Sequence, residues 1–189
     1  MGEQGKLYVV SAPSGAGKTT LIKNVLNRFK DLSYSVSHTT REPRENEQHG
    51  MDYFFITKKE FEEMIKQDLL LEWAEVHENY YGTSKDFITA NLVKGKSMIL
   101  DIDVQGARQI MKSDMDMVTI FIMPPSIEVL SRRLKNRGTD SQKVIDTRIK
   151  NAKTEIAKKK LYQYVVINDD LDHARKELCM IFEQEMAKE

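Results

Sequence analysis

The sequence predicts an α/β fold whose core is a parallel sheet. Four short apolar runs have the length and the β-branched composition of buried strands, at residues 7–10, 97–101, 118–122 and 164–167. Helix-like stretches separate these runs, and apolar strands that alternate with helices are typical of a parallel sheet covered on both faces. A glycine-bearing loop joins the first strand to the first helix, which is a typical opening of such a fold.

The helices of this core are indicated by apolar residues that recur at helical spacing. They are expected over 18–29, from Val104 onward, over 127–135 with Ser126 as the N-cap, over a long charged stretch that ends at Lys160, and over 171–186. The single cysteine, Cys179, lies in an apolar part of the last helix. We expect it to be a small buried hydrophobic residue.

Residues 34–93 have a different pattern. Strand character at 34–38, 53–56 and 69–73 is surrounded by polar residues. Thr57-Lys58-Lys59-Glu60 has the capping-box pattern of a helix N-terminus. We therefore expect a mixed α+β insertion between the first and second core strands.

Composition and charge exclude several classes of protein. The 189 residues include 29 Lys and Arg and 29 Asp and Glu, so the formal net charge is zero. A protein that mainly binds duplex DNA usually carries a basic excess, so no nucleic-acid partner is expected. The balanced net charge does not exclude a small basic pocket. No apolar segment approaches the ~20 residues of a membrane helix, and no signal peptide precedes the first strand. We expect a cytoplasmic protein without a membrane partner.

The loop after the first strand has a recognisable chemistry. Residues 12–19, Ala-Pro-Ser-Gly-Ala-Gly-Lys-Thr, fit the Walker A pattern with Ala12 in place of the first glycine. Glycines let backbone N–H groups turn inward around phosphate oxygens, and the following helix adds its positive N-terminal dipole. Lys18 supplies a charge to the terminal phosphates, and Thr19 offers a hydroxyl to Mg²⁺. The motif predicts binding of a nucleoside triphosphate, and the Ala12 methyl is tolerated where φ stays negative.

Asp101 stands at the end of the second core strand. A carboxylate in that place suits a Walker B-like role, in which it holds Mg²⁺ or the waters around the ion. The alternative is a strand-terminal aspartate without a ligand.

A second group of motifs lies in and after the insertion. It comprises Ser37 to Arg44 (Ser-His-Thr-Thr-Arg-Glu-Pro-Arg), Asp52-Tyr53, Leu71-Glu72-Trp73-Ala74, Asn79-Tyr80-Tyr81-Gly82-Thr83 and Ile99 to Gly106. Together with the phosphate loop, these motifs make the chain resemble the guanylate kinases, a family of nucleoside monophosphate kinases in the P-loop NTPase superfamily. The resemblance extends to Val166-Ile167-Asn168-Asp169-Asp170 and so covers essentially the full length.

The resemblance implies a domain organisation. A three-layer P-loop core would comprise residues 1–33 and 94–189, and the mixed insertion over 34–93 would bind the nucleoside monophosphate. A helical lid segment over 136–150 would belong to the core.

The resemblance further implies that the insertion binds GMP. Arg41 and Arg44 would clamp the phosphate, since a planar guanidinium suits a phosphate dianion. Glu72 would read guanine, because a carboxylate offers two acceptors to the ring N–H and the exocyclic amine, whereas adenine presents an acceptor at that ring position. The full set implied for GMP is Ser37, Arg41, Arg44, Tyr53, Glu72, Tyr81, Gly82, Thr83 and Asp103. In this set the hydroxyls of Ser37 and Thr83 would donate to the base carbonyl, those of Tyr53 and Tyr81 would donate to the phosphate, and Asp103 would accept near the amine.

The remaining implied residues serve the triphosphate and the transfer step. ATP would contact Ala12, Pro13, Ser14, Gly15, Ala16, Gly17, Lys18, Thr19, Thr20, Arg133, Arg137 and Asn168. The catalytic set would be Lys18, Arg41, Asp101, Arg137 and Arg148, with Thr19 and Asp101 at Mg²⁺, partly through water. Arginines delivered by a closing segment stabilise the charge on the moving phosphoryl group and exclude water. For Arg133 a bracing role in the lid is the alternative.

The implied reaction is phosphoryl transfer from Mg·ATP to GMP, and to dGMP, giving ADP and GDP for guanine nucleotide synthesis and salvage. The attacking phosphate oxygen is already anionic, so no general base is needed, and His38 and His77 are expected in scaffold or surface roles. The alternatives are a kinase for another nucleoside monophosphate and a catalytically inactive guanylate-kinase-like module that binds peptides. The oligomeric state stays open, a homo-oligomer included.

Overall fold

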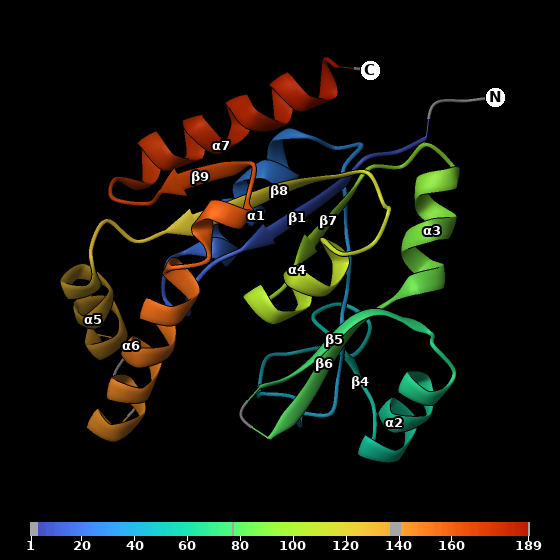
Figure 1. Cartoon of the computed structure of the whole chain (residues 1–189), viewed down its shortest axis with the longest axis horizontal. Coiled ribbons are helices and arrows are strands. Elements are labelled where there is room, and N and C mark those ends of the chain that lie inside the picture. The colour runs from blue at the N-terminus through green and yellow to red at the C-terminus, as the bar shows by residue number, and fades with distance from the viewer. Residues whose placement is uncertain (1–3, 77, 137–140, 189) are drawn as a thin grey trace. The chain divides into compact units, whose positions relative to one another are not determined.

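The structure is a computed structural model that describes residues 4–76, 78–136 and 141–188 (Figure 1). Its strands are β1 (Leu7–Ser11), β2 (Ser33–Tyr34), β3 (His38–Thr39), β4 (Phe54–Phe55), β5 (Leu70–Val76), β6 (Asn79–Ser84), β7 (Met98–Asp101), β8 (Met117–Met123) and β9 (Tyr164–Ile167). Its helices are α1 (Lys18–Arg28), α2 (Lys58–Lys66), α3 (Lys85–Val93), α4 (Val104–Ile110), α5 (Ile127–Asn136), α6 (Gln142–Ile156), the short 3₁₀ helix η1 (Lys159–Leu161) and α7 (Leu171–Met186).

Five strands form one sheet, in the order β2-β7-β1-β8-β9. The pairs β2–β7 and β8–β9 are parallel, with Ser33 opposite Met98 and Ile120 opposite Tyr164. The strands are joined through helices rather than hairpins, as parallel pairing requires. The predicted α/β fold with a parallel core sheet is therefore confirmed.

A second sheet has four strands, in the order β4-β3-β6-β5. β3 pairs parallel with β4 and antiparallel with β6, and β5 pairs antiparallel with β6. This mixed sheet, together with α2, is the α+β part expected within residues 34–93. The capping box of α2 is confirmed, because Thr57 Oγ1 accepts from the Glu60 amide at 3.2 Å and Glu60 Oε2 accepts from the Thr57 amide at 2.7 Å.

The strand expected over residues 34–38 is wrong in its extent. The structure divides this segment between β2 in the parallel sheet and β3 in the mixed sheet. The Ser35 amide still donates to the Ile99 carbonyl at 2.9 Å, which continues the ladder of β2 with β7. The chain then leaves that sheet, because the next ladder bonds of the segment are made with β4 and β6.

The long charged helix expected to end at Lys160 is also shorter than predicted. α6 ends at Ile156 and η1 follows it. The Lys158 amide donates to the Glu155 carbonyl at 3.0 Å, and the Leu161 amide donates to the Lys158 carbonyl at 3.0 Å. These three-residue bonds tighten the backbone from an α-helix into 3₁₀ turns just before Tyr162, which is buried.

The chain divides into two compact units. The first comprises residues 1–7 and 31–116 and holds the mixed sheet with α2, α3 and α4. The second comprises residues 8–30 and 117–189 and holds α1, β8, α5, α6, β9 and α7. The division predicted from the sequence, with an insertion over 34–93 and a lid over 136–150, stays a prediction.

Aromatic and aliphatic packing holds the second unit together. α7 runs beside β9 (Figure 1), and its Phe182 stacks on Tyr8 with ring centroids 4.3 Å apart. α5 and α6 share a cluster formed by Leu130, Leu134, Ile145 and Ala152, with Ile149 packed against it. Cys179 is buried on α7, as expected for a small hydrophobic residue.

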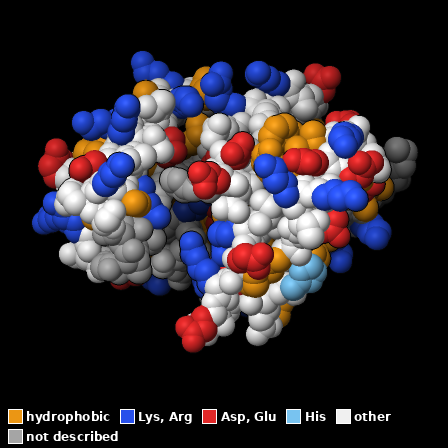
Figure 2. All heavy atoms as spheres, turned by 90° about the horizontal axis from the view of Figure 1, so that it is seen from below, with side chains coloured by type: hydrophobic (Ala, Val, Ile, Leu, Met, Phe, Trp, Pro, Cys, Tyr) orange, Lys and Arg blue, Asp and Glu red, His pale blue; other side chains and the backbone are white. Residues whose placement is uncertain are grey.

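The surface carries both signs of charge. On the face shown in Figure 2, Lys and Arg side chains are interspersed with Asp and Glu, in keeping with the balanced composition. Among the helices in the part of the chain that the structure describes, none has the length and apolarity needed to cross a bilayer.

Candidate functional site

The phosphate loop lies in the second unit between β1 and α1. Gly15 and Gly17 have φ values of 90° and 94°, in the left-handed region that glycine adopts at no steric cost. The Ala16 amide donates to the Pro13 carbonyl at 3.0 Å, which closes the turn. Gly17 then precedes the first residue of α1, Lys18, so the positive end of the helix dipole faces the loop.

The loop backbone accommodates alanine where the Walker A pattern has its first glycine. Among the described residues, the non-glycine positions with positive φ are Asp68 and Glu78. Ala12 is thus outside the left-handed region, and its methyl group causes no backbone strain. The two positions that do need glycine hold glycine.

Asn168 holds the loop from the end of β9. Its buried Nδ2 donates to the Ala16 carbonyl at 2.7 Å. A Cβ on Gly17 would lie 2.3 Å from the same Nδ2, so the close approach of the amide requires glycine there. Arg133 on α5 donates through Nη2 to the Asn168 carbonyl at 2.9 Å. Asn168 and Arg133 therefore support the backbone of the phosphate loop. Their predicted contacts with ATP stay predictions.

The other residues predicted for the triphosphate begin or end elements. Lys18 is half-buried at the first position of α1, and Thr19 and Thr20 are exposed in its first turn. Asp101 is half-buried at the last position of β7, in the first unit. Arg148 is half-buried on α6. Arg137 lies outside the described residues.

The predicted base reader is a buried carboxylate in the first unit. Glu72 on β5 is 4% exposed, and Thr83 on β6 is 0% exposed. The Thr83 hydroxyl donates to Glu72 Oε1 at 2.6 Å. A hydroxyl has one proton to donate, so in this structure Thr83 holds Glu72 and does not present that proton to a ligand.

Helix α4 approaches the same carboxylate. A Cβ on Gly106 would lie 2.1 Å from Glu72 Oε2, which is closer than any real contact. Asp103 caps α4 by accepting from the Gly106 amide at 2.8 Å. Gln109, one turn on, donates to the Trp73 carbonyl and accepts from the Trp73 amide at 3.1 Å, so it pairs with the backbone of β5 next to Glu72.

The residues predicted for the phosphate end of the GMP site come from the loop after β3, from the position before β4 and from β6. Arg41 Nε donates to the Tyr81 hydroxyl at 3.2 Å, and the guanidinium carbon lies 5.5 Å from the Tyr53 ring centroid. The rings of Tyr53 and Tyr81 meet edge to face at 5.9 Å. Burial raises the pKa of Tyr53, and the charge of Asp101 adds to this, so the phenol keeps its proton as a donor. The structure therefore brings Arg41, Tyr53 and Tyr81 together, whereas the Arg44 side chain is exposed.

The remaining predicted residues have structural contacts. Gly82 is buried, and a Cβ there would lie 2.9 Å from the Glu72 carbonyl oxygen and from Phe61 Cζ. Ser37 is half-buried, and its carbonyl accepts from the Phe54 amide at 2.9 Å. His38 stacks on Phe54 at 4.9 Å, and burial lowers its pKa, as a scaffold role predicts. His77 lies outside the described residues.

Comparison with known proteins decides the family. A sequence model described as guanylate kinase matches residues 4–185. The chain belongs to the guanylate kinase family. A guanylate kinase of Geobacter sulfurreducens is 48% identical over 188 residues, which is 100% of this chain and 93% of that protein. A guanylate kinase of Neisseria gonorrhoeae is 48% identical over 178 residues, 94% of this chain and 87% of that one.

A solved structure agrees. The crystal structure of guanylate kinase from Anaplasma phagocytophilum matches with a TM-score of 0.80 at 35% identity, and covers 97% of this chain and 87% of that chain. The predicted family is confirmed, and with it the prediction of an enzyme: a transferase of the kinase class that binds nucleotides. The roles of the individual residues stay predictions.

Sequence reasoning missed two side chains that contact the residues predicted for the site, Gln109 and Glu47. Gln109 lies one turn after Gly106 on α4, and no pattern in the sequence links it to β5. Glu47 contacts Arg41 and the backbone of Arg44. The signal that could have found Glu47 is its place three residues after Arg44, in a segment that also carries the two arginines.

Proposed function

We propose that the chain transfers a phosphoryl group from Mg·ATP to GMP, giving ADP and GDP, in the guanine nucleotide synthesis and salvage of the cytoplasm. The observation that carries this proposal is the buried Glu72 carboxylate, held by Thr83 and approached by Gly106. A carboxylate can accept several hydrogen bonds, and guanine offers two adjacent donors on its ring N–H and exocyclic amine. Adenine, which has an acceptor at the ring position, would leave the site unsatisfied.

The other end of the monophosphate would meet positive charge and hydroxyl groups. Arg41, Arg44, Tyr53 and Tyr81 would donate to the phosphate, with each charge-assisted hydrogen bond contributing about 1.5–3 kcal/mol. dGMP carries the same base and the same phosphate as GMP. We therefore expect dGMP to serve as a substrate as well.

The chemistry of transfer requires alignment and stabilised charge rather than a protein base. The phosphate loop would hold the donor through its backbone N–H groups and Lys18. Arg148, with Arg137 of the predicted lid, would stabilise the charge on the transferring group and exclude water. Arg41 would hold the acceptor phosphate in line.

The oxygen donors present suit Mg²⁺, which prefers carboxylate, hydroxyl and phosphate oxygens. Thr19 is exposed at the start of α1, and Asp101 ends β7, so both present hard oxygen ligands. Among the described residues, no group of three or more His, Cys, Asp and Glu could hold a metal ion. Thr19 and Asp101 would each offer an oxygen, directly or through water, to Mg²⁺ bound by substrate phosphates, whose charge the ion neutralises.

A substrate panel tests the proposal. Purified protein with Mg²⁺ and ATP should form GDP from GMP, and the kcat/KM for GMP should exceed those for AMP, UMP and CMP by at least about 10³-fold. Comparable turnover of another monophosphate would favour the alternative substrate class. GMP binding without any GDP formation would favour the inactive binding module.

Two variants assign the roles. Lys18→Ala should nearly abolish turnover while GMP still binds. Glu72→Gln should lower the preference for GMP over AMP by at least about tenfold, because one acceptor becomes a donor. Unchanged turnover in the first variant, or unchanged base preference in the second, would refute the role assigned to that residue.

A further inference from the structure

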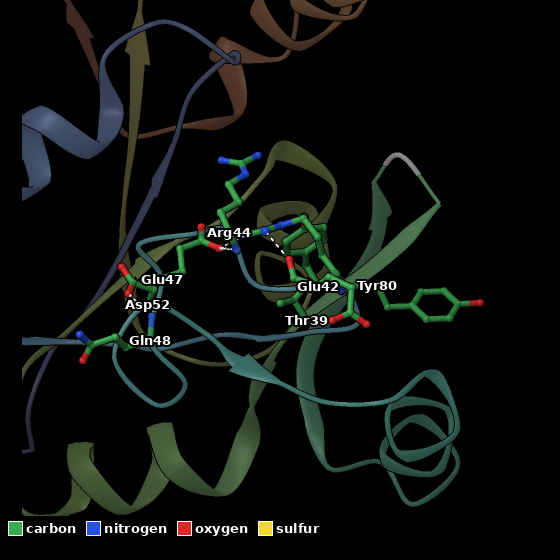
Figure 3. Close-up of polar contacts among 9 residues, drawn as sticks. Thr39, Glu42, Arg44, Glu47, Gln48, Asp52 and Tyr80 are labelled. Atoms are coloured by element: carbon green, nitrogen blue, oxygen red, sulfur yellow. Dashed lines mark hydrogen bonds and ion pairs between the residues drawn. The ribbon is translucent and has the colours of Figure 1, made fainter. Parts of the chain in front are cut away.

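Glu47 links the two arginines of the predicted phosphate end. Its Oε1 and Oε2 accept hydrogen bonds from Arg41 Nη2 at 2.9 and 2.8 Å. Oε2 also accepts from the backbone N–H of Arg44 at 2.9 Å, the contact drawn as a dashed line in Figure 3. One side chain thus fixes the guanidinium of Arg41 and the main chain of Arg44.

The other donors of Arg41 are also engaged. Nη1 donates to the Glu42 carbonyl at 2.7 Å, and Nε donates to the Tyr81 hydroxyl at 3.2 Å. A guanidinium has five N–H donors in a rigid fork. The carboxylate of Glu47, the Glu42 carbonyl and Tyr81 engage all three nitrogens, and the bond to Glu42 uses one of the two Nη1 hydrogens. The orientation of Arg41 is set before any ligand is bound.

The pair is sheltered from solvent. The side chains of Arg41 and Glu47 are 17% and 18% exposed, so their interaction is screened less than that of an ordinary surface pair. Burial raises the pKa of the Glu47 carboxyl, but hydrogen bonds from the Arg44 amide and the Arg41 guanidinium outweigh it and hold that pKa below its usual value. Glu47 therefore stays ionised at neutral pH.

We propose that Glu47 is a positioning residue for phosphate binding, which holds Arg41 and the Arg44 backbone in the arrangement that receives the phosphate of the monophosphate. This inference rests on the proposed function. The two arginines lie in the loop that follows β3, and immobilising a long side chain on binding costs conformational entropy. A side chain that is already held loses less when the ligand arrives. The exposed Arg44 side chain would then donate hydrogen bonds directly to the phosphate, and Arg41 would donate through its remaining Nη1 hydrogen.

The sign of the effect makes the proposal testable. If Glu47 only offset the charge of Arg41, its removal would strengthen the binding of a phosphate dianion. The proposal predicts the opposite, because a released Arg41 loses its orientation. Guanosine, which has the base but no phosphate, separates the two ends of the site.

The experiment is calorimetric titration of the full chain with GMP and with guanosine. We expect Glu47→Ala to raise the Kd for GMP about tenfold, as the loss of a charge-assisted hydrogen bond implies, and to leave the Kd for guanosine unchanged. Glu47→Gln, which keeps one acceptor oxygen but no charge, should give an intermediate rise. The matched control is Glu45→Ala, an exposed carboxylate in the same loop, with less than a twofold change.

The outcomes are distinct. An unchanged or lowered Kd for GMP in Glu47→Ala, or an equal weakening of guanosine, would overturn the proposal. Should Glu47→Ala fail to fold, Glu47→Gln decides by the same two titrations. In steady-state assays KM for GMP should rise while kcat changes less than about threefold. If wild-type protein binds AMP as tightly as GMP, the proposed function fails. The inference on Glu47 is then tested by whether Glu47→Ala weakens binding of the nucleotide more than binding of the nucleoside that lacks the phosphate.

Discussion

The absence of a side chain on Gly106 leaves space for the carboxylate of Glu72, the predicted base reader. Glu72 Oε2 occupies the space that a side chain on Gly106 would take, and Glu72 Cδ lies 2.9 Å from the same Cβ position. The opposite carboxylate oxygen is fixed by Thr83. Because one oxygen is tied and the other faces α4, a methyl group at position 106 must move either the carboxylate or the helix.

Gly106→Ala should therefore impair recognition of guanine. We expect KM for GMP to rise at least about tenfold and the preference for GMP over IMP, which lacks the exocyclic amine, to fall by a similar factor. The helix itself should tolerate the change, since alanine is favoured over glycine in helices by about 1 kcal/mol. The measurement is kcat/KM for both nucleotides, with Arg108→Gln on the exposed side of α4 as the control. Unchanged values in Gly106→Ala would mean that Glu72 does not read the base.

At the scale of elements, a hydrogen bond joins the end of β9 to the loop that precedes α1. Asn168, at the end of the last strand of the parallel sheet, donates to the carbonyl of Ala16. Arg133 of α5 donates to the backbone carbonyl of Asn168. Two elements that are distant from the loop in sequence, the end of β9 and α5, thus hold it. The bond from Asn168 to the Ala16 carbonyl fixes the backbone of this loop, whose N–H groups are the predicted donors to phosphate.

Asn168→Ala should accordingly weaken binding of the triphosphate. The Ala16 carbonyl would lose its buried donor, which costs about 1–3 kcal/mol, and the loop would open. KM for ATP should rise about tenfold or more, and KM for GMP should stay within twofold, as measured by initial rates with each substrate varied. Asp169→Ala, at an exposed neighbouring position, is the control. A lowered melting temperature with an unchanged KM for ATP would contradict a role in the loop.

The elements that were predictable from sequence are those whose pattern reports their own environment. The strand over 164–167 and the helix over 171–186 are uniformly apolar or regularly periodic, and both occur within those bounds. The strand predicted over residues 34–38 was wrong in extent because this polar stretch contributes to two sheets. Its partners β7, β4 and β6 come later in the chain. The same holds for the candidate site: Glu72 was predicted from its motif, whereas Glu47 and Gln109 contact partners that only the folded chain brings near.

At the scale of the whole molecule, the residues predicted to bind the two nucleotides belong to different units. The residues assigned to GMP, from Ser37 to Asp103, lie in the first unit, and the phosphate loop with Arg133 and Asn168 lies in the second. Each nucleotide should therefore stabilise mainly the unit that binds it.

Hydrogen exchange followed by mass spectrometry measures this directly. A ligand that binds only the closed state slows local opening by a factor of about 1 + [L]/Kd, or ~100-fold at a hundred times its Kd. GMP should slow exchange in residues 38–56 and 70–84, and a non-hydrolysable ATP analogue should slow it in residues 12–20 and 165–170. Lys18→Ala should lose the second effect and keep the first, and AMP in place of GMP should slow neither segment of the first unit. Protection by GMP confined to residues 12–20 would place its site in the wrong unit, since a base held by Glu72 must shield β5 and β6 from opening.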